Sequence, residues 1–260
     1  MTKRKIWIIP LVIGACLLLG LLLGKPLYYA YRELEYRLGE PTAAEQIVHD
    51  YAQKERVPYG VYPEDLIQLL EDNIETVDFV LAYPFREDAK AAVTYSRETV
   101  PHFLQWDPNW GYEKYGSSYL AVTGCGPTCL AMVGYYLTGN EEMLPHRVAQ
   151  FAEENGYYEP GYGSSWTLIS EGSQALGLQA RELPLVESKM VDALEAGEPI
   201  ILALGEGDFT TTGHYIVLTG VENGAFRVND PNSFALSQSL WTYEHLESQI
   251  RNIWALSIEN

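Results

Sequence analysis

The hydrophobic positions divide the chain into an apolar amino-terminal run, a region of helical periodicity and a longer region that mixes helices with strands. The stretch Ile6 to Gly24 contains no charged residue. As a helix this stretch would span roughly 29 Å, about the thickness of the hydrocarbon core of a bilayer. We therefore expect residues 1–26 to form a cytoplasmic tip and one transmembrane helix.

Basic residues set the expected orientation of this helix. Lys3, Arg4 and Lys5 precede the apolar stretch, and only Lys25 follows it directly. The positive-inside rule then places the amino terminus in the cytoplasm and the rest of the chain outside. Two alternatives stay open, namely a cleaved signal peptide and a lipoprotein signal with a lipid on Cys16. The expected location is thus the cell membrane, with a secreted or lipid-anchored protein as the alternative.

The next region, residues 27–99, is expected to be a helical extension. Its first part, up to Glu55, is helical in pattern and charged. A second amphipathic helix is expected over Tyr62 to Leu70, with the acidic pair Glu64 and Asp65 near its start, since acidic residues favour the first turn of a helix. This extension could hold the following domain away from the bilayer or cover part of its substrate cleft.

Residues 100–260 are expected to form one domain of the α+β class. An apolar stretch at 199–204 is typical of a strand at the centre of a sheet. Two further strands, 214–219 and 225–230, are separated by Asn223-Gly224, which is a strong signal for a hairpin turn. The sheet is therefore expected to be antiparallel in this part.

Charge and cysteine content narrow the class of protein. The formal net charge is -18, and so acidic a surface repels nucleic acid phosphates, which excludes a nucleic acid partner. Of the three cysteines, only Cys125 and Cys129 lie outside the apolar stretch. An exported domain without a disulfide framework raises the question of what these two thiols do. Cys129 is expected to be a small buried core residue.

Cys125 occupies the position of a nucleophile. Pro127 is tolerated only in the first turn of a helix, so Cys125 must lie at or just before the start of a helix that ends at Gly139. The unpaired amides and the positive end of the helix dipole favour a negatively charged sulfur at this point. The flanking Gly124 and Gly126 leave room for a substrate carbonyl. These features predict a catalytic cysteine.

A cysteine nucleophile needs a base, and the chain has five histidines. His214 opens a predicted strand after the flexible segment Thr210 to Gly213 and is the expected base. The other four are expected to be ordinary surface residues: His49, His102, His146 and His245.

Asp230, at the end of the next strand, is the candidate for the third member. Period-two alternation puts His214 with Ile216 and Asp230 with Val228 on one side of the hairpin. A plain two-residue turn would oppose Val217 to Asp230, whereas one extra residue would oppose Ile216 to Asp230 and bring His214 diagonally near it. We predict the second register, with the Nδ1 proton of His214 donated to Asp230. Asn229 is a weaker candidate because it points to the other face.

These blocks together resemble a known family. Gly124-Cys125-Gly126-Pro127-Thr128, Gly213-His214-Tyr215 and Asn229-Asp230-Pro231, in this order, are similar to papain-like cysteine peptidases of the bacteriocin-processing type. The chain resembles in particular their stand-alone bacterial relatives. The resemblance implies a papain-like cysteine peptidase fold, in which a helical half carries the nucleophile and an antiparallel sheet carries the histidine and the aspartate.

The resemblance also implies that Gln105 donates a hydrogen bond to the developing oxyanion. In the family this glutamine lies much closer to the nucleophile, so residues 106–122 would be an inserted loop. Its aromatic residues could wall the cleft: Trp110, Tyr112, Tyr115 and Tyr119. The sequence contains no phosphate-binding loop, so a fused transporter is not expected, and the double-glycine leader specificity of such relatives is not carried over.

The expected function is therefore that of an extracytoplasmic thiol hydrolase that cleaves peptide or other amide bonds through an acyl-enzyme on Cys125. Alternatives are an acyltransferase or amidase on the same site and a non-catalytic extracellular binding domain. The expected partners are a peptide or protein substrate and the membrane. Neither a Cys/His metal cluster nor a dinucleotide motif occurs, so no metal or cofactor is expected. The oligomeric state is not predicted.

Overall fold

The computed structural model describes residues 23–258, which form two compact units that divide between Pro84 and Phe85. The sequence prediction placed this boundary between residues 99 and 100. The predicted membrane helix, Ile6 to Gly24, lies outside the described residues except for its last two positions. Within residues 23–258, no helix combines the length and the apolar character needed to cross a bilayer.

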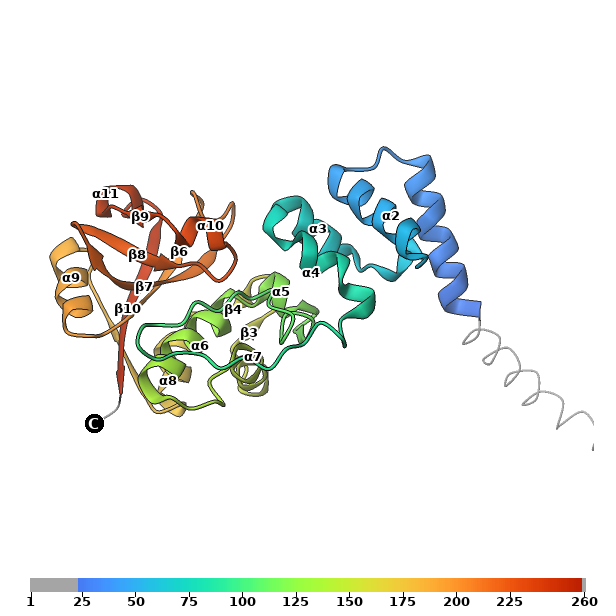
Figure 1. The fold of residues 1–260 in the computed structure, drawn as a ribbon. Helices are drawn as coiled ribbons and strands as arrows, with labels where there is room; N and C mark the ends of the chain where they lie inside the picture. Colours follow the sequence, from blue (N-terminus) through green and yellow to red (C-terminus); the bar gives the residue numbers. More distant parts are fainter. Residues whose placement is uncertain (1–22, 259–260) are drawn as a thin grey trace, which may run out of the picture. The chain divides into compact units, whose positions relative to one another are not determined.

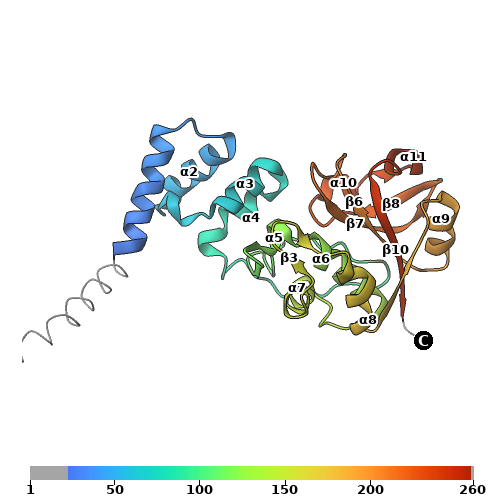
Figure 2. The same cartoon turned by 180° about the vertical axis from the view of Figure 1, so that it is seen from behind.

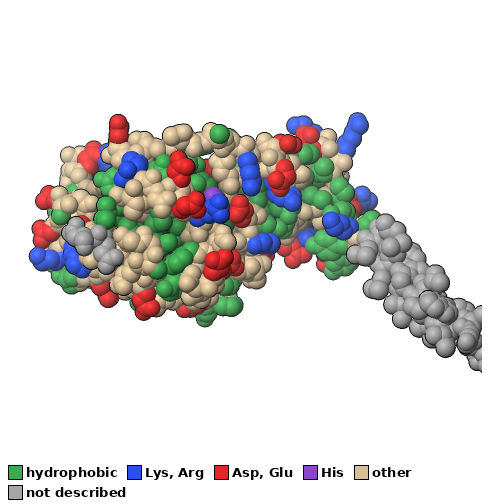
Figure 3. Space-filling view, turned by 90° about the horizontal axis from the view of Figure 1, so that it is seen from below, with side chains coloured by type: hydrophobic (Ala, Val, Ile, Leu, Met, Phe, Trp, Pro, Cys, Tyr) green, Lys and Arg blue, Asp and Glu red, His purple; other side chains and the backbone are tan. Residues whose placement is uncertain are grey.

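The first unit is helical. It contains a helix over residues 23–38, followed by α2 (Ala43–Glu55), α3 (Glu64–Asp72), α4 (Val77–Leu81) and short 3-10 turns at Tyr59–Val61, Ile74–Thr76 and Tyr83–Phe85 (Figure 1). Thr42 caps α2 through a reciprocal capping box with Glu45. The helix predicted over Tyr62 to Leu70 is present as α3, which begins and ends two residues later. Hydrophobic side chains remain at the surface beside the point where the described chain begins (Figure 3).

His49 belongs to the interior of this unit, so the prediction of a surface residue is wrong. Its ring stacks on Tyr36 with the centroids 3.9 Å apart, and its Nε2 atom lies 3.3 Å from Glu33 Oε1. Both partners come from the helix at 23–38, and this long-range packing has no signature in the local pattern around His49.

The second unit contains a six-stranded sheet in the order β5-β10-β6-β7-β8-β9. All neighbouring strands are antiparallel, as predicted. The strands are β5 (Leu178–Glu182), β6 (Ile200–Leu204), β7 (His214–Glu222), β8 (Ala225–Asn229), β9 (Leu240–Trp241) and β10 (Ile250–Ile258). The apolar strand β6 lies between β10 and β7 in the interior of the sheet, and its residues are buried on both faces.

Helices cover both faces of this sheet (Figures 1 and 2). The helices on the face of the nucleophile helix are α5 (Leu120–Thr123), α6 (Cys125–Thr138), α7 (Pro145–Glu154), the π-helical turn Leu168–Gly172 and α8 (Ser173–Ala175). The opposite face is covered by α9 (Glu187–Glu195). Two short helices, α10 (Phe234–Ser237) and α11 (Tyr243–Leu246), precede and follow β9 along the chain.

Strand alternation explains the two cores of this unit. Ile201 and Val217 pack in one buried cluster with Leu130 of α6, whereas Ile200 and Ile216 point to the opposite face and join the cluster that contains α9. The sheet therefore separates the nucleophile helix from α9. The α+β class, with a helical half and an antiparallel sheet, is confirmed.

The hairpin of β7 and β8 has the predicted register, but the extra residue that sets it is not in the turn. The turn itself is the tight pair Asn223-Gly224, whose φ angles are 53° and 77°. The extra residue is Thr219, because Leu218 pairs with Val228 and Gly220 pairs with Arg227. Beyond this bulge Val217 opposes Asn229, which brings Ile216 opposite Asp230. The register was right, but the extra residue lies within the strand and not in the turn.

Candidate active site

Cys125 is the first residue of α6 and is half-buried. The helix start is fixed by Gly124 before it and by Pro127 in the first turn, and the helix ends at Gly139 in the left-handed conformation (φ 66°), as predicted. The position next to Cys125 must be glycine, since a Cβ atom at Gly126 would lie 2.7 Å from the Ser164 side chain. The sulfur therefore lies at a helix amino terminus, against a closely packed wall.

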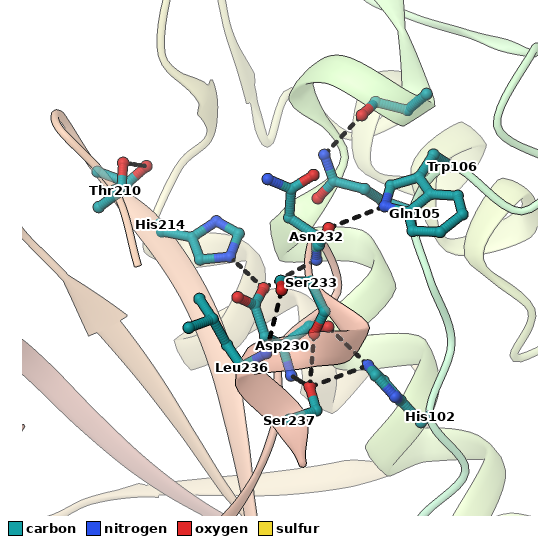
Figure 4. Close-up of polar contacts among 12 residues, drawn as sticks. His102, Gln105, Trp106, Thr210, His214, Asp230, Asn232, Ser233, Leu236 and Ser237 are labelled. Carbon is teal, nitrogen blue, oxygen red and sulfur yellow. Dashed lines mark hydrogen bonds and ion pairs between the residues drawn. The ribbon is translucent and has the colours of Figure 1, made fainter. Parts of the chain in front are cut away.

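His214 and Asp230 meet at one end of the sheet. His214 is the first residue of β7, Asp230 follows the last residue of β8, and His214 Nε2 lies 2.7 Å from Asp230 Oδ1 (Figure 4). The predicted pairing of the two side chains is confirmed, but the predicted atom, Nδ1, is wrong. The two residues are diagonal neighbours, so the ring nitrogen farther from the backbone reaches the carboxylate. Nδ1 is left to face away from Asp230.

The surroundings of His214 favour its protonated form. Burial lowers the pKa of the ring, but the charge of Asp230 and hydrogen bonds to Asp230 and Cys125 outweigh it and raise the pKa of His214 to about 10. The imidazolium is thus retained at neutral pH beside the Cys125 sulfur. A cation next to a cysteine at a helix amino terminus favours the reactive thiolate.

Asp230 is held in place from several directions. Its Oδ1 atom accepts a hydrogen bond from Asn232 N (2.8 Å), and its own amide donates to Ser237 Oγ (2.8 Å). His102 Nε2 lies 2.6 Å from the backbone carbonyl oxygen of Asp230 and must donate to it. The prediction that His102 is an ordinary surface residue is therefore wrong. It braces the carboxylate-bearing loop.

Gln105 lies between the Asp230 loop and the nucleophile. It is buried, its amide donates to Pro231 O (2.7 Å), and its Nε2 donates to Ala121 O (2.7 Å) in the short helix that precedes Cys125. Its Oε1 atom has no hydrogen-bond partner among the described residues. The second Nε2 hydrogen is not used by these contacts, which is what an oxyanion donor needs. The catalytic role of Gln105 stays a prediction.

One short segment, which we call the brace (His102 to Trp106), contacts three consecutive carbonyls. His102 donates to Asp230 O, Gln105 N to Pro231 O, and Trp106 Nε1 to Asn232 O at 2.8 Å. Figure 4 shows the His102 and Trp106 side chains reaching the loop that carries Asp230.

Cys125 and His214 line an open cleft of about 430 Å³. Its other lining residues include Glu159, Ser164, Ser165, Gly213 and two exposed aromatic residues, Tyr162 (88% exposed) and Trp166 (48% exposed). The sequence analysis missed Tyr162 and Trp166. The sequence signal that could have revealed them is the segment from Gly161 to Trp166, because two glycines on either side of an aromatic residue indicate an exposed turn. Both glycines have positive φ angles.

The aromatic residues that were expected to wall the cleft are instead part of the core. Trp110, Tyr112, Tyr115 and Tyr119 are all buried, and none of them lines the cleft. The segment folds into a small ribbon, β1 (Lys114–Tyr115) with β2 (Ser118–Tyr119), so its aromatic side chains pack inward.

Two tyrosines fix the wall opposite Cys125. Tyr115 Oη lies 2.7 Å from Ser164 Oγ, and Tyr215 Oη donates to Ser164 O at 3.2 Å. Burial raises the pKa of both phenols, so both stay neutral. The ribbon β3 (Tyr158–Glu159) and β4 (Gly163–Ser164) is thereby held against the nucleophile helix.

Cys129 is a buried, free thiol, as expected. Burial raises the pKa of Cys129 well above its ordinary value, and this leaves the protonated thiol as the form at neutral pH. Within residues 23–258 no group of three His, Cys, Asp or Glu side chains could hold a metal ion.

Residues 97–257 match the sequence model of the Peptidase_C39 like family. A search of curated protein sequences gives no match.

Similar solved structures share 15–21% identity with the chain. The peptidase domain of Streptococcus ComA, a bifunctional ABC transporter involved in quorum sensing, has 21% identity, covers 53% of this chain and 93% of its own, and gives a TM-score of 0.41. A double-glycine-motif protease from an AMS/PCAT transporter, in complex with the leader peptide, has 21% identity, 64% and 94% coverage, and a TM-score of 0.38. A C39-like peptidase from Bacillus anthracis has 15% identity, 62% and 96% coverage, and a TM-score of 0.42.

Proposed function

The chain belongs to the Peptidase_C39-like family and is a cysteine peptidase-like hydrolase, and on that premise we propose that it cleaves peptide or other amide bonds through an acyl-enzyme on Cys125. The observation that carries the proposal is the buried pair of His214 and Asp230 beside Cys125 at the start of α6. The cleft that Cys125 lines has a volume of about 430 Å³, which is within the usual range of ligand-binding sites.

The proposed reaction begins with a thiolate and an imidazolium. The Cys125 sulfur attacks the substrate carbonyl carbon, and the developing oxyanion accepts hydrogen bonds from the Cys125 amide and Gln105 Nε2. His214 donates its proton to the leaving amine, and the acyl group remains on sulfur. His214 then takes a proton from water, which attacks the thioester and releases the acid. Asp230 keeps the imidazole in one orientation through both steps.

We also propose that the catalytic unit lies on the outer side of the cell membrane. The proposal rests on the uncharged stretch Ile6 to Gly24 and the basic residues Lys3 to Lys5 before it. Fractionation of cells that produce the full chain should recover it with the membranes. A membrane-impermeant protease should remove the catalytic unit from intact spheroplasts, and full protection would contradict the orientation.

The activity is tested with the full chain and a library of peptides that carry a cleavable fluorophore. Cleavage should appear with the native chain and be lost with Cys125→Ala, whereas Cys129→Ala serves as the matched cysteine control. Adding a primary amine acceptor separates hydrolysis from transfer, since a transferase would give the amide product in place of the acid. The absence of any Cys125-dependent product from peptides or simple amides would reject the proposed activity.

A further inference from the structure

The helix at residues 23–38 has its apolar residues on the outside. Leu27, Tyr31, Leu34 and Leu38, here called the apolar stripe, are 66%, 56%, 53% and 78% exposed. At 3.6 residues per turn these four residues fall within an arc of about 60° on one face of the helix. A helix on the surface of a globular unit would normally turn such a face toward the core.

The opposite face of the same helix is already used for packing. Arg32 is buried and pairs with Glu64 Oε1 at 3.0 Å, Tyr36 stacks on His49, and Tyr29 lies against Gly60. A Cβ atom at Gly60 would lie 2.8 Å from the Tyr29 backbone. The helix is therefore fixed in rotation by polar and aromatic contacts, and it cannot turn its apolar stripe inward without exposing the buried Arg32 and unstacking Tyr36 from His49.

The spacing of the stripe is that of a coiled-coil seam. The intervals between its residues are four, three and four positions, and this alternation lets the stripe face one partner helix along its length. Leu23 and Tyr28, each 46% exposed, flank the stripe. A helix that lies on a lipid surface usually has a basic polar face. Here acidic residues outnumber basic residues between 27 and 84, which opposes contact with anionic lipid.

We propose that the apolar stripe pairs with the same stripe of a second copy of this chain, as a short parallel coiled coil next to the membrane. The proposal rests on the proposed anchor, because residues 1–22 lead directly into this helix. So short a seam would be marginal between free chains. Two chains anchored side by side in one membrane meet at a high effective concentration and in parallel orientation, which removes most of that cost.

The parallel arrangement makes a specific prediction about cysteine cross-links. In a parallel pair each stripe residue faces its own copy, so a cysteine at that position can form a symmetric disulfide. The test uses the full chain in isolated membranes, with Cys16→Ser and Cys125→Ser as background. Leu27→Cys and Leu34→Cys should give a disulfide dimer on mild oxidation. Lys25→Cys is the matched control, since Lys25 is exposed but lies on the far side of the helix from Leu27.

The expected result is a dimer yield at least about tenfold higher at 27 and 34 than at 25, because disulfides require Cα atoms within roughly 7 Å. Equal yields at all three positions, or none, would overturn the proposal. Leu27→Glu with Leu34→Glu should convert the membrane-anchored chain from dimer to monomer, as measured by the loss of energy transfer between labelled copies reconstituted together in vesicles. These two residues are exposed, so the fold should survive the change.

Two further outcomes keep the proposals separate. A chain that is recovered in the soluble fraction yet still cross-links at 27 and 34 would reject the anchor and support the pairing. A fluorophore on Leu34→Cys that is quenched by brominated lipid would show that the stripe contacts the bilayer, which would overturn the pairing. Peptide cleavage by the monomeric variant would leave the proposed activity intact in either case.

Discussion

His214 Nε2 donates to Asp230 Oδ1 across 2.7 Å, and both residues are buried. In the folded chain the pKa of His214 is raised to about 10. The ion pair therefore contributes its full stabilisation at pH values below about 6.5, the ordinary pKa of histidine. This contribution decreases as the pH rises from about 6.5 and is lost as the pH passes through the raised pKa of His214. Both the stability from this pair and the supply of the imidazolium should therefore decline on the alkaline side.

Asp230→Asn should move the alkaline limb of the pH–rate profile to lower pH by about 1–3 units, because a neighbouring opposite charge shifts a pKa by that amount. Burial, which lowers the pKa of His214, would then be opposed only by the contact with Cys125. The measurement is kcat/KM from pH 5 to 10. Asp208→Asn is the control, since Asp208 pairs with His245 at 2.9 Å on the surface. An unmoved alkaline limb in Asp230→Asn would argue against the role of this carboxylate.

Iodoacetamide should label Cys125 rapidly at neutral pH and leave Cys129 unlabelled in the folded chain. Cys125 is accessible from the cleft and lies beside the His214 imidazolium, whereas Cys129 is fully buried and its pKa is raised by burial. Mass spectrometry of the digested protein locates the label, and unfolding in urea should expose Cys129. Labelling of Cys125 no faster than a free thiol would favour a non-catalytic binding domain.

His102→Ala should lower kcat/KM by about 10- to 100-fold, because small displacements of a catalytic group are costly. The lost hydrogen bond is the one at 2.6 Å to the Asp230 carbonyl. His102→Gln retains a donor and should recover part of the activity. His245→Ala, at an exposed histidine, is the control. Equal kcat/KM values for His102→Ala and His102→Gln would show that the hydrogen bond donated by residue 102 is unimportant for activity.

Gln105→Ala should lower kcat by about 10²- to 10³-fold with little change in KM, as expected for loss of an oxyanion donor. The same substitution removes the bond to Ala121 O, so thermal unfolding must be measured in parallel. A lower Tm with unchanged kcat would assign Gln105 a structural role alone.

Trp166→Ala should raise KM by about tenfold and leave kcat nearly unchanged. Trp166 is half exposed on the cleft wall and is supported edge-on by Trp254, with the ring centroids 5.9 Å apart. Such rigid aromatic residues contribute much of the binding energy at recognition surfaces. Phe85→Ala, at a similarly exposed residue outside the cleft, is the control. A fall in kcat with constant KM would show that Trp166 acts in the chemical step.

The sequence was most informative where the determinants are local. Pro127 and Gly139 mark the two ends of α6, and strand alternation places His214 and Asp230 on a common side. These signals depend on neighbours within a few positions, so one chain is enough to detect them.

Features that depend on contacts distant in sequence were not predictable in this way. His102 and Asp230 are 128 positions apart, and nothing near His102 indicates its partner. The choice of Nε2 depends on how far the ring reaches across a diagonal pair, and the bulge at Thr219 could equally have been in the turn. The buried ring of Tyr115 and the exposed ring of Trp166 differ through tertiary packing that composition does not reveal.

The brace also bears on how this site can vary between relatives. Gln105 is positioned by its contact with Pro231 O, on the loop that carries the orienting carboxylate, and not by its distance along the chain from Cys125. The number of residues between Gln105 and Ala121, whose carbonyl accepts from Gln105 Nε2, is consequently less constrained than these contacts, because the intervening segment contains its own ribbon. A relative could lengthen or shorten that segment and keep the same geometry, so long as the contact with the Asp-Pro loop is preserved.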